Sequence, residues 1–386
     1  MIDMETGVIN EIKKSPLKDI FEHDCTITDV YGSGNNWATG NLYFGRKHED
    51  DIRESFRRAV EPCDYLQSFF LCHSMGGGTG SGLCTFVTKL LADEYPEVSR
   101  LVTSVFPSQN DDVITSPYNT ILALNELTEY ADCVFPIDNE ALTRITQSQR
   151  KEGEMTKAKT RAKSFDEMNN IVGNMLLDLT SSARFSGSMN VDLMEISMNM
   201  VPFPKLHYLV TSMSPMSNCR TISKLRSMDQ MFSDVCNSSA QLTCVEPAKH
   251  CYLASGVLVR GKCNLLELRK NIDKLHKKLT FVPWNQDGWK VGHCYAPPLN
   301  MESSILNFSN NTGINSIFQL IKDHFQLLYK RRAHLHHYTS VDGFELSRFE
   351  EVTENLDFLI KQYKKLEGTE SSISANIQMR PIQIAD

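Results

Sequence analysis

The chain has 386 residues, of which 41% are hydrophobic and 23% charged, and its formal net charge is −7. This length allows two or three domains with cores of their own, and the composition is that of an ordinary globular protein. The negative charge argues against a general nucleic-acid binder, and no apolar run approaches the roughly 18 residues of a membrane span. The N-terminus lacks the basic start of a signal peptide, and the 11 cysteines show no Cys-x-x-Cys spacing, which predicts reduced thiols in the cytoplasm.

A glycine-rich loop stands between a predicted strand and a predicted helix. The strand is the apolar run Tyr65–Leu71, and the helix is Leu83–Tyr95, whose apolar residues recur with a helical period. Glycine lets the backbone approach a ligand closely, and a helix start offers unpaired N–H groups. The loop therefore predicts a phosphate cradle, made by Gly76, Gly77, Gly78, Thr79, Gly80 and Ser81. A tight structural turn is the alternative, since the loop has neither a Gly-x-Gly-x-x-Gly pattern nor the lysine of a P-loop.

The unbroken GGGTGSG heptad at 76–82 resembles the signature loop of the tubulin family and its bacterial division relatives. The resemblance implies an α/β fold: a Rossmann-like parallel-sheet GTPase domain, a central helix, a second α+β domain and a C-terminal helical hairpin. It implies GTP or GDP and magnesium as cofactors. The implied boundaries are 1–164 for the nucleotide domain, 165–185 for the central helix, 186–313 for the second domain, 314–368 for the hairpin and 369–386 for a disordered tail.

Two acidic residues near the N-terminus, Asp3 and Glu5, resemble an acidic pair that lies near the phosphates and magnesium in tubulins. A floppy charged terminus is the alternative. Under the resemblance, about 65 residues with the family's first strand, first glycine loop and first helix are expected ahead of this point and are missing. An alternative start, a spliced isoform or an error in the gene sequence would each explain this.

Two further loops are candidates for nucleotide contact. Asn35 lies in Tyr31–Gly40, between glycines, and resembles the tubulin loop that faces the terminal phosphate; an ordinary Asn-Gly surface turn is the alternative. Asp112 matches an acid on the ribose side in tubulins. Ser116 is expected to cap the helix that follows, with Pro117 in its first turn.

Three residues are candidates for contact with the base. Asn139 follows the predicted strand Cys133–Ile137, and its amide offers a donor and an acceptor that suit a purine edge. A simple helix cap is as good an interpretation of this residue without context. The resemblance adds Phe165, in place of a stacking Tyr, and Asn169 as a base-reading residue.

The strongest helical pattern spans Phe165–Phe185, with apolar residues at i, i+3, i+4, i+7, i+8 and i+11. Thr143–Ser164 before it is basic and has no clear apolar face. It predicts a solvated, mobile insertion or, alternatively, a contact for an acidic partner surface.

The loop after this helix, Gly187–Glu195, holds Asn190, Asp192 and Glu195. Acids at a helix start usually complement the helix dipole. In tubulins this loop contacts the nucleotide of the next subunit in a filament. The resemblance therefore implies that Glu195 is catalytic in trans, orienting or deprotonating a water beside the terminal phosphate.

A buried strand is also predicted at Leu101–Phe106, which is mostly apolar and ends before Pro107. The remaining pattern predicts strands at Leu206–Thr211 and Tyr252–Val259, a helix at Leu265–Leu279 and a β-pair in Phe281–Ala296. Two long helices are predicted at Ile314–Tyr338 and Phe344–Leu366. The polar tail carries few acids, unlike α- and β-tubulin. Several short stretches, among them VITSPYN and AHLHHY, place the chain closest to the epsilon branch.

The resemblance implies a GTP-binding structural protein of the centriole, centrosome or basal body, in the cytoplasm and cytoskeleton. Its implied partners are other tubulins in head-to-tail contacts and centriolar or microtubule-associated proteins, without nucleic acid or membrane. Three alternatives stay open: a truncated isoform that acts as an interaction module without nucleotide, another tubulin branch that polymerises into microtubules, or a standalone nucleotide hydrolase.

Overall fold

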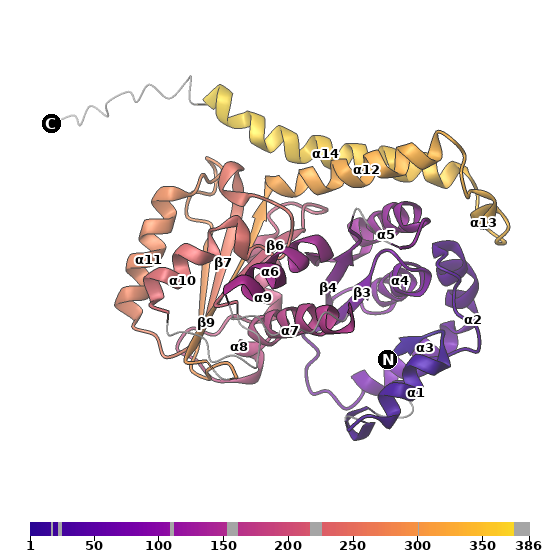
Figure 1. Ribbon diagram of the computed structural model, residues 1–386, viewed down its shortest axis with the longest axis horizontal. Coiled ribbons are helices and arrows are strands. Elements are labelled where there is room, and N and C mark those ends of the chain that lie inside the picture. Colours follow the sequence, from indigo (N-terminus) through magenta and orange to yellow (C-terminus); the bar gives the residue numbers. More distant parts are fainter. Residues whose placement is uncertain are drawn as a thin grey trace.

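The computed structural model describes residues 1–16, 18–21, 25–108, 112–152, 161–216, 226–299 and 301–373 (Figure 1). Its strands are β1 (Ile2–Asp3), β2 (Ile27–Thr28), β3 (Ser68–Ser74), β4 (Ser99–Phe106), β5 (Cys133–Asp138), β6 (Leu209–Ser214), β7 (Tyr252–Gly261), β8 (Trp289–Cys294) and β9 (Ser303–Asn311). Its first helices are α1 (Thr6–Lys14), α2 (Gly45–Lys47), α3 (Glu49–Val60), α4 (Cys84–Glu94), α5 (Ser116–Tyr130), α6 (Asn139–Glu152) and α7 (Arg161–Leu179). The later helices are α8 (Ser181–Arg184), α9 (Leu193–Met200), α10 (Met228–Val235), α11 (Leu265–Lys278), α12 (Asn315–Tyr329), α13 (His336–Thr339) and α14 (Ser347–Ile373). No helix within these ranges is both long and apolar enough to cross a membrane.

The first large sheet is parallel, in the order β3–β4–β5. Successive residues of a strand point to opposite faces, and here they enter two different cores. Val102 packs with residues of α5, α12 and α14, whereas its neighbour Leu101 packs with residues of α6 and α7. Because both faces are covered, β4 and β5 are almost wholly buried, and the predicted strands at Leu101–Phe106 and Cys133–Ile137 are confirmed.

The outer strand β3 differs from β4 and β5, because one of its edges has no strand partner among the described residues. The strand predicted at Tyr65–Leu71 forms, but it begins three residues later, at Ser68, and runs to Ser74. The predicted burial is wrong for Phe70 and Leu71, which are only half-buried. The strands β1 and β2 form a separate parallel pair, and no ladder connects it to β3. A free strand edge presents unpaired backbone N–H and C=O groups.

The second large sheet is mixed, in the order β6–β9–β7–β8, and only β7 and β8 are parallel to each other. The central strand β7 is buried along its whole length and confirms the prediction at Tyr252–Val259. The strand predicted at Leu206–Thr211 begins three residues later, at Leu209. The β-pair predicted in Phe281–Ala296 is wrong, because only β8 forms and Phe281 makes a single bridge to Tyr252.

The central helix joins the two sheets and ends earlier than predicted. Its apolar stripe is confirmed, since Met168, Ile171, Met175 and Leu179 are all buried. The helix stops at Leu179, however, and α8 is separate. Hydroxyls compete with the backbone there: Thr180 Oγ1 donates to the carbonyl of Leu176, and Ser181 Oγ donates to that of Asp178.

The basic segment 143–164 is helical at both of its ends, which form parts of α6 and α7, while residues 153–160 lie outside the described ranges. Within α6, Ile145 and Thr146 are buried, so the prediction of a wholly solvated insertion is wrong for this part. The apolar side was hidden in the sequence because the buried positions are few and one of them is a threonine.

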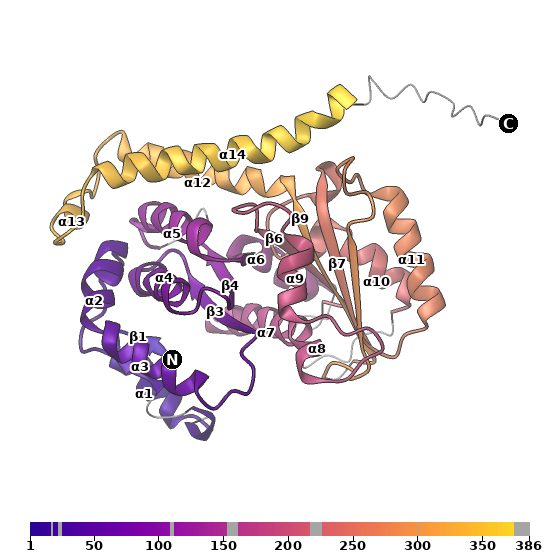
Figure 2. The same cartoon turned by 180° about the vertical axis from the view of Figure 1, so that it is seen from behind.

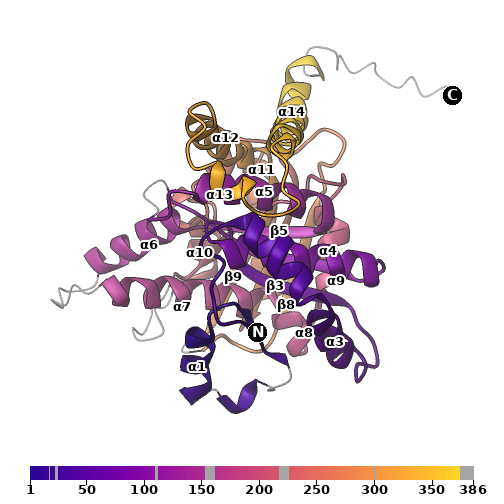
Figure 3. The same ribbon diagram turned by 90° about the vertical axis from the view of Figure 1, so that its right-hand side faces the viewer.

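The C-terminal helices α12 and α14 lie side by side along one flank of the molecule, on the side opposite α1 (Figures 2 and 3). The first of them ends at Tyr329, so the helix predicted at Ile314–Tyr338 is wrong beyond that residue. Arg332 and His334 have φ values of 50° and 58°, a left-handed backbone that no α-helix accommodates. The last helix runs to Ile373, past the expected start of the tail at 369, and residues 374–386 lie outside the described ranges.

Candidate functional site

The loop after β3 leaves the carboxyl edge of the parallel sheet, where α/β proteins bind their ligands. It runs through Met75–Gly78 into a π-helical turn, Thr79–Leu83, which continues as α4. Two predicted phosphate-binding hydroxyls are engaged within the protein: Thr79 Oγ1 lies 2.9 Å from the Ser33 hydroxyl, and Ser81 Oγ donates to the Gly77 carbonyl. Burial lowers the pKa of His73, just before the loop, to about 4, so this imidazole is neutral at pH 7.

The glycines of the loop fall into two groups. A Cβ on Gly78 would lie 2.5 Å from the Asn36 nitrogen, and one on Gly80 would lie 2.7 Å from the Ser74 oxygen. These glycines are required for packing between loops. Gly77 is different, because the nearest atom to its virtual Cβ is Asn35 Oδ1 at 3.8 Å. The open side of the cradle therefore lies at Gly77, where a phosphate has room to approach the backbone.

Asn35 borders that open side, as the sequence predicts. Its φ of 52° is left-handed, and its side chain is exposed. Its carbonyl accepts hydrogen bonds from Thr115 Oγ1 at 2.9 Å and from Asn119 Nδ2 at 2.8 Å. The backbone of this loop is thus fixed from the neighbouring helix α5, while the amide of Asn35 remains directed toward the cradle opening.

Asn119 connects these loops and was not singled out by the sequence. Its Nδ2 also donates to the Gly76 carbonyl at 2.9 Å, and its Oδ1 accepts from the Trp37 amide at 2.9 Å and from Tyr338 Oη at 2.6 Å. The residue is fully buried. Its residue type alone does not mark it, because the same helix carries other polar residues such as Asn125 and Glu126; Asn119 differs in the number of partners that its buried amide contacts.

Ser116 does not cap α5, contrary to the prediction. It is the first residue of the helix, and Thr115 occupies the cap position without a side-chain capping bond. Asp112, predicted to face the ribose, is exposed in the loop before this helix. That loop follows β4, so it leaves the same edge of the sheet as the cradle.

The acidic pair at the N-terminus lies beside the Asn35 loop. Asp3 ends β1, and its carboxylate accepts from the Glu5 amide at 3.0 Å. Glu5 is close to Gly32, since its Oε1 lies 2.6 Å from where a Cβ on that glycine would be. Glu5 therefore lies against the first part of the loop that contains Asn35, and Asp3 contacts Glu5.

The three predicted base-binding residues share one corner, at the starts of α6 and α7. Thr143 Oγ1 donates to the sulfur of Met168 at 3.8 Å, which places the first turn of α6 against the turn of α7 that holds Phe165 and Asn169. Both of these side chains are exposed. The cap interpretation of Asn139 is wrong, because Asp138 Oδ1 accepts from the Glu140 amide instead.

Glu195 lies at the other end of the sheet. It is in the first turn of α9, and the residue before this helix, Asp192, accepts from Gln67 Nε2 at 3.4 Å. Gln67 immediately precedes β3, whereas the cradle immediately follows it. Within one chain, the loop of Glu195 and the phosphate cradle therefore stand at opposite ends of the same strand.

Comparison with known proteins agrees with this architecture. Residues 1–147 match the model of the Tubulin/FtsZ family, GTPase domain, and residues 204–323 match that of the Tubulin C-terminal domain. The chain is 50% identical to the tubulin epsilon chains of Homo sapiens and Mus musculus, over 96% of this chain and 82% of each relative. It is 32% identical to the human tubulin beta-1 chain, over 96% of this chain and 81% of that protein. The chain belongs to the tubulin family.

Within that family it is an epsilon-tubulin-like protein, since its identity to the epsilon chains is well above its identity to the beta-1 chain. The matched GTPase region of this tubulin contains the cradle and the loops of Asn35 and Asp112, together with Asn139. Phe165, Asn169 and Glu195 lie between the two matched regions.

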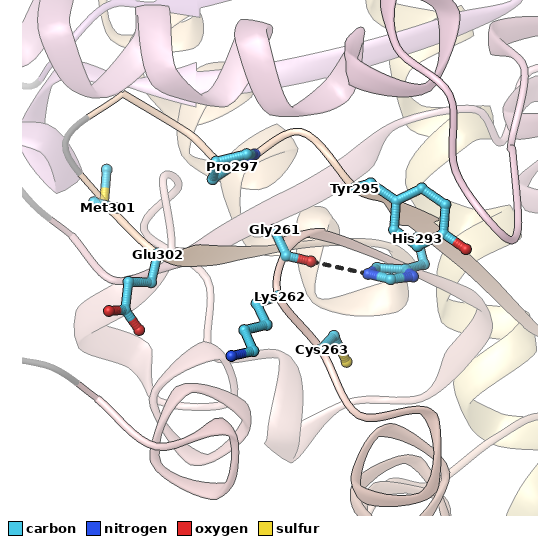
Figure 4. Close-up of a pocket in the computed structure, with 8 residues that line it drawn as sticks. All are labelled: Gly261, Lys262, Cys263, His293, Tyr295, Pro297, Met301 and Glu302. Atoms are coloured by element: carbon cyan, nitrogen blue, oxygen red, sulfur yellow. Dashed lines mark hydrogen bonds between the residues drawn. The ribbon is translucent and has the colours of Figure 1, made fainter.

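A cavity of about 680 Å³ lies in the second domain of this tubulin, at the ends of β7 and β8 (Figure 4). The imidazole of His293 on its wall points at the carbonyl of Gly261, to which Nε2 donates at 3.0 Å (Figure 4). The same imidazole holds the loop before Glu195, because its Nδ1 accepts from the Ser188 hydroxyl at 2.8 Å.

Buried Arg260, in β7, contacts the end of the central helix and the loop that follows β8. Its guanidinium contacts Asp178 Oδ1 at 2.9 Å and donates to the carbonyls of Ala296 and Pro297. Burial raises the pKa of Asp178 above its ordinary value, although the neighbouring guanidinium opposes this. The pair fixes the end of the central helix to the end of β7.

Proposed function

We propose that this tubulin is a cytoskeletal subunit that binds GTP or GDP in the cradle of Gly76–Ser81 and hydrolyses GTP only in a head-to-tail assembly. Glu195 of one subunit serves the nucleotide held by the next. The family match to a GTPase domain supports the nucleotide, and the geometry of the sheet supports the assembly.

The observation that carries the proposal is the separation of the two half-sites. The strand β3 has seven residues, and a rise of about 3.3 Å per residue puts its ends roughly 20 Å apart. A carboxylate must lie within hydrogen-bonding reach of the water that it activates. Glu195 therefore cannot act on a phosphate in its own cradle, whereas a stacked neighbour would bring the two ends together.

Each residue has a distinct role in this site. Gly77 and Asn35 border the open space for the terminal phosphates, and Asp112 faces the sugar. Asn139, Phe165 and Asn169 bind the base by hydrogen bonding and stacking. Asp3 and Glu5 would hold magnesium together with the phosphates, and the ion would neutralise charge on the phosphate oxygens.

Mixing two inactive variants tests the trans arrangement. Glu195→Ala keeps a working cradle, and Gly77→Asp keeps Glu195 but places a carboxylate where phosphate must bind. Each variant alone should hydrolyse GTP at least tenfold more slowly than the native chain, and an equimolar mixture should regain part of the activity. A mixture no faster than its components would contradict a site shared between chains. Gly77→Ala serves as the matched control, because its Cβ has room and no charge.

The alternative of an interaction module without nucleotide is favoured by one observation, the unpaired outer edge of β3. Nucleotide content after purification separates the two functions. Copurified GTP or GDP in about equimolar amount supports the cradle, and a folded chain free of nucleotide supports the interaction module.

We further propose a place in the centriole, centrosome or basal body, with other tubulins and centriolar or microtubule-associated proteins as partners. The support is the similarity to the epsilon chains. Imaging of the tagged full chain beside a centriole marker tests this, and a diffuse signal without centriolar enrichment would count against it.

A further inference from the structure

The carboxylate of Glu195 has an ion-pair partner on a different element. Lys290 Nζ lies 3.0 Å from Glu195 Oε2, and the two side chains are 28% and 44% exposed. Lys290 is in β8, in register with Gly256 of β7, and so belongs to the second sheet. An ion pair this exposed contributes little to folding stability, because water screens it. The position of Lys290 beside the proposed catalytic acid therefore needs an explanation other than folding stability.

The strand β8 also holds the other end of the loop that carries Glu195, at Ser188 and Met189. The His293 amide donates to the Met189 carbonyl at 2.8 Å, and its imidazole accepts from Ser188. Lys290 and His293 therefore fix the two ends of the segment 188–195 from a single strand. A rigid strand is a better support for a site than a loop, because its side chains are positioned by packing.

Glu195 must approach a polyphosphate, and this creates an electrostatic problem. A carboxylate is repelled by the phosphate oxygens of the neighbouring subunit, and a free glutamate side chain samples several rotamers. An ammonium group on one carboxylate oxygen offsets the repulsion and restricts those rotamers. The second oxygen remains available to a water.

We propose that Lys290 is a positioning residue for Glu195, holding the carboxylate oriented toward the nucleotide of the adjacent subunit. This inference rests on the proposed function, because it needs Glu195 to act in trans. It adds a residue of the second domain to the site, acting through Glu195 without touching the nucleotide.

The mixing assay isolates this role, since only the subunit that provides Glu195 should depend on Lys290. The Lys290→Met change is placed either in the Gly77→Asp chain, which provides Glu195, or in the Glu195→Ala chain, which binds the nucleotide. We expect about tenfold slower GTP turnover in the first mixture and less than a twofold change in the second. Lys290→Arg in the providing chain should restore most of the rate, and Lys262→Met, which changes a lysine just after the neighbouring strand β7, should leave the rate unaltered.

An equal loss of GTP turnover, whichever chain carries Lys290→Met, would assign Lys290 a merely structural role. No loss of turnover when the change is in the providing chain would also overturn the proposal. If the providing Lys290→Met chain does not fold, Lys290→Gln replaces it in the same comparison. The failure of the proposed function looks different: the mixture with native Lys290 would then show no turnover, and both proposals would fall together.

Discussion

The two half-sites of this tubulin are built in contrasting ways. The cradle is held by close backbone contacts at Gly78 and by a buried amide, Asn119, that bonds three neighbouring segments, those of Asn35, Gly76 and Tyr338. The segment 188–195 that carries Glu195 is held by a half-exposed ion pair, by the Ser188 hydroxyl and by single hydrogen bonds at Met189 and Asp192. The proposed binding half is therefore preorganised within the chain, whereas the proposed catalytic half depends on a few single contacts to neighbouring elements.

The largest effect is expected from filling the packed side of the cradle. Gly78→Ala places a methyl group 2.5 Å from backbone, which cannot move aside cheaply, and should lower the free energy of unfolding by about 3 kcal/mol. Gly77→Ala, one residue earlier, should change it by less than about 0.5 kcal/mol because the space is open. Urea unfolding of both variants checks this. Equal losses would mean that the two glycines are not different in kind.

Removing the buried amide should have the next largest effect. Asn119→Ala leaves the Trp37 amide and the Gly76 carbonyl without their partner and should cost about 2 kcal/mol of stability. Nucleotide affinity should fall as well, because the loops that border the cradle lose their common support. The control is Asn125→Ala in the same helix, whose amide bonds only to the exposed Asn355 among the contacts described. Thermal unfolding and a fluorescent GTP titration would measure the two effects, and similar values for both variants would contradict a special role of Asn119.

The sequence predicted much of the fold because its strongest signals are local. The stripe of α7 and the buried strands β4, β5 and β7 depend on periodicity, which a single chain displays directly. The errors came from tertiary context. The residues of β3 are largely apolar, yet no strand pairs with its outer edge in the described part of the chain, and nothing in Phe70 or Leu71 indicates that this edge is unpaired.

The site shows the same division. The glycine loop and Asn35 could be proposed from the sequence because their chemistry is visible in the residue types. Asn119, Lys290 and His293 were missed because their importance arises from partners that are 32 to 219 residues away in sequence. Only the fold brings such pairs together, so a motif search finds the residues that face a ligand more readily than those that hold them in place.

The smallest effect is expected from the lightly held half-site. Ser188→Ala removes one hydrogen bond to His293 and should cost about 0.5–1 kcal/mol of stability, since the serine itself is exposed. GTP turnover in the mixing assay should fall about threefold when the change is in the chain that provides Glu195, because a loop freed at one end samples more positions. Ser186→Ala is the matched control, as this serine contacts Tyr295 through its main-chain oxygen, which the substitution keeps. A stability loss as large as that of Asn119→Ala would show that the loop is as firmly built as the cradle, and the contrast between the two half-sites would then be wrong.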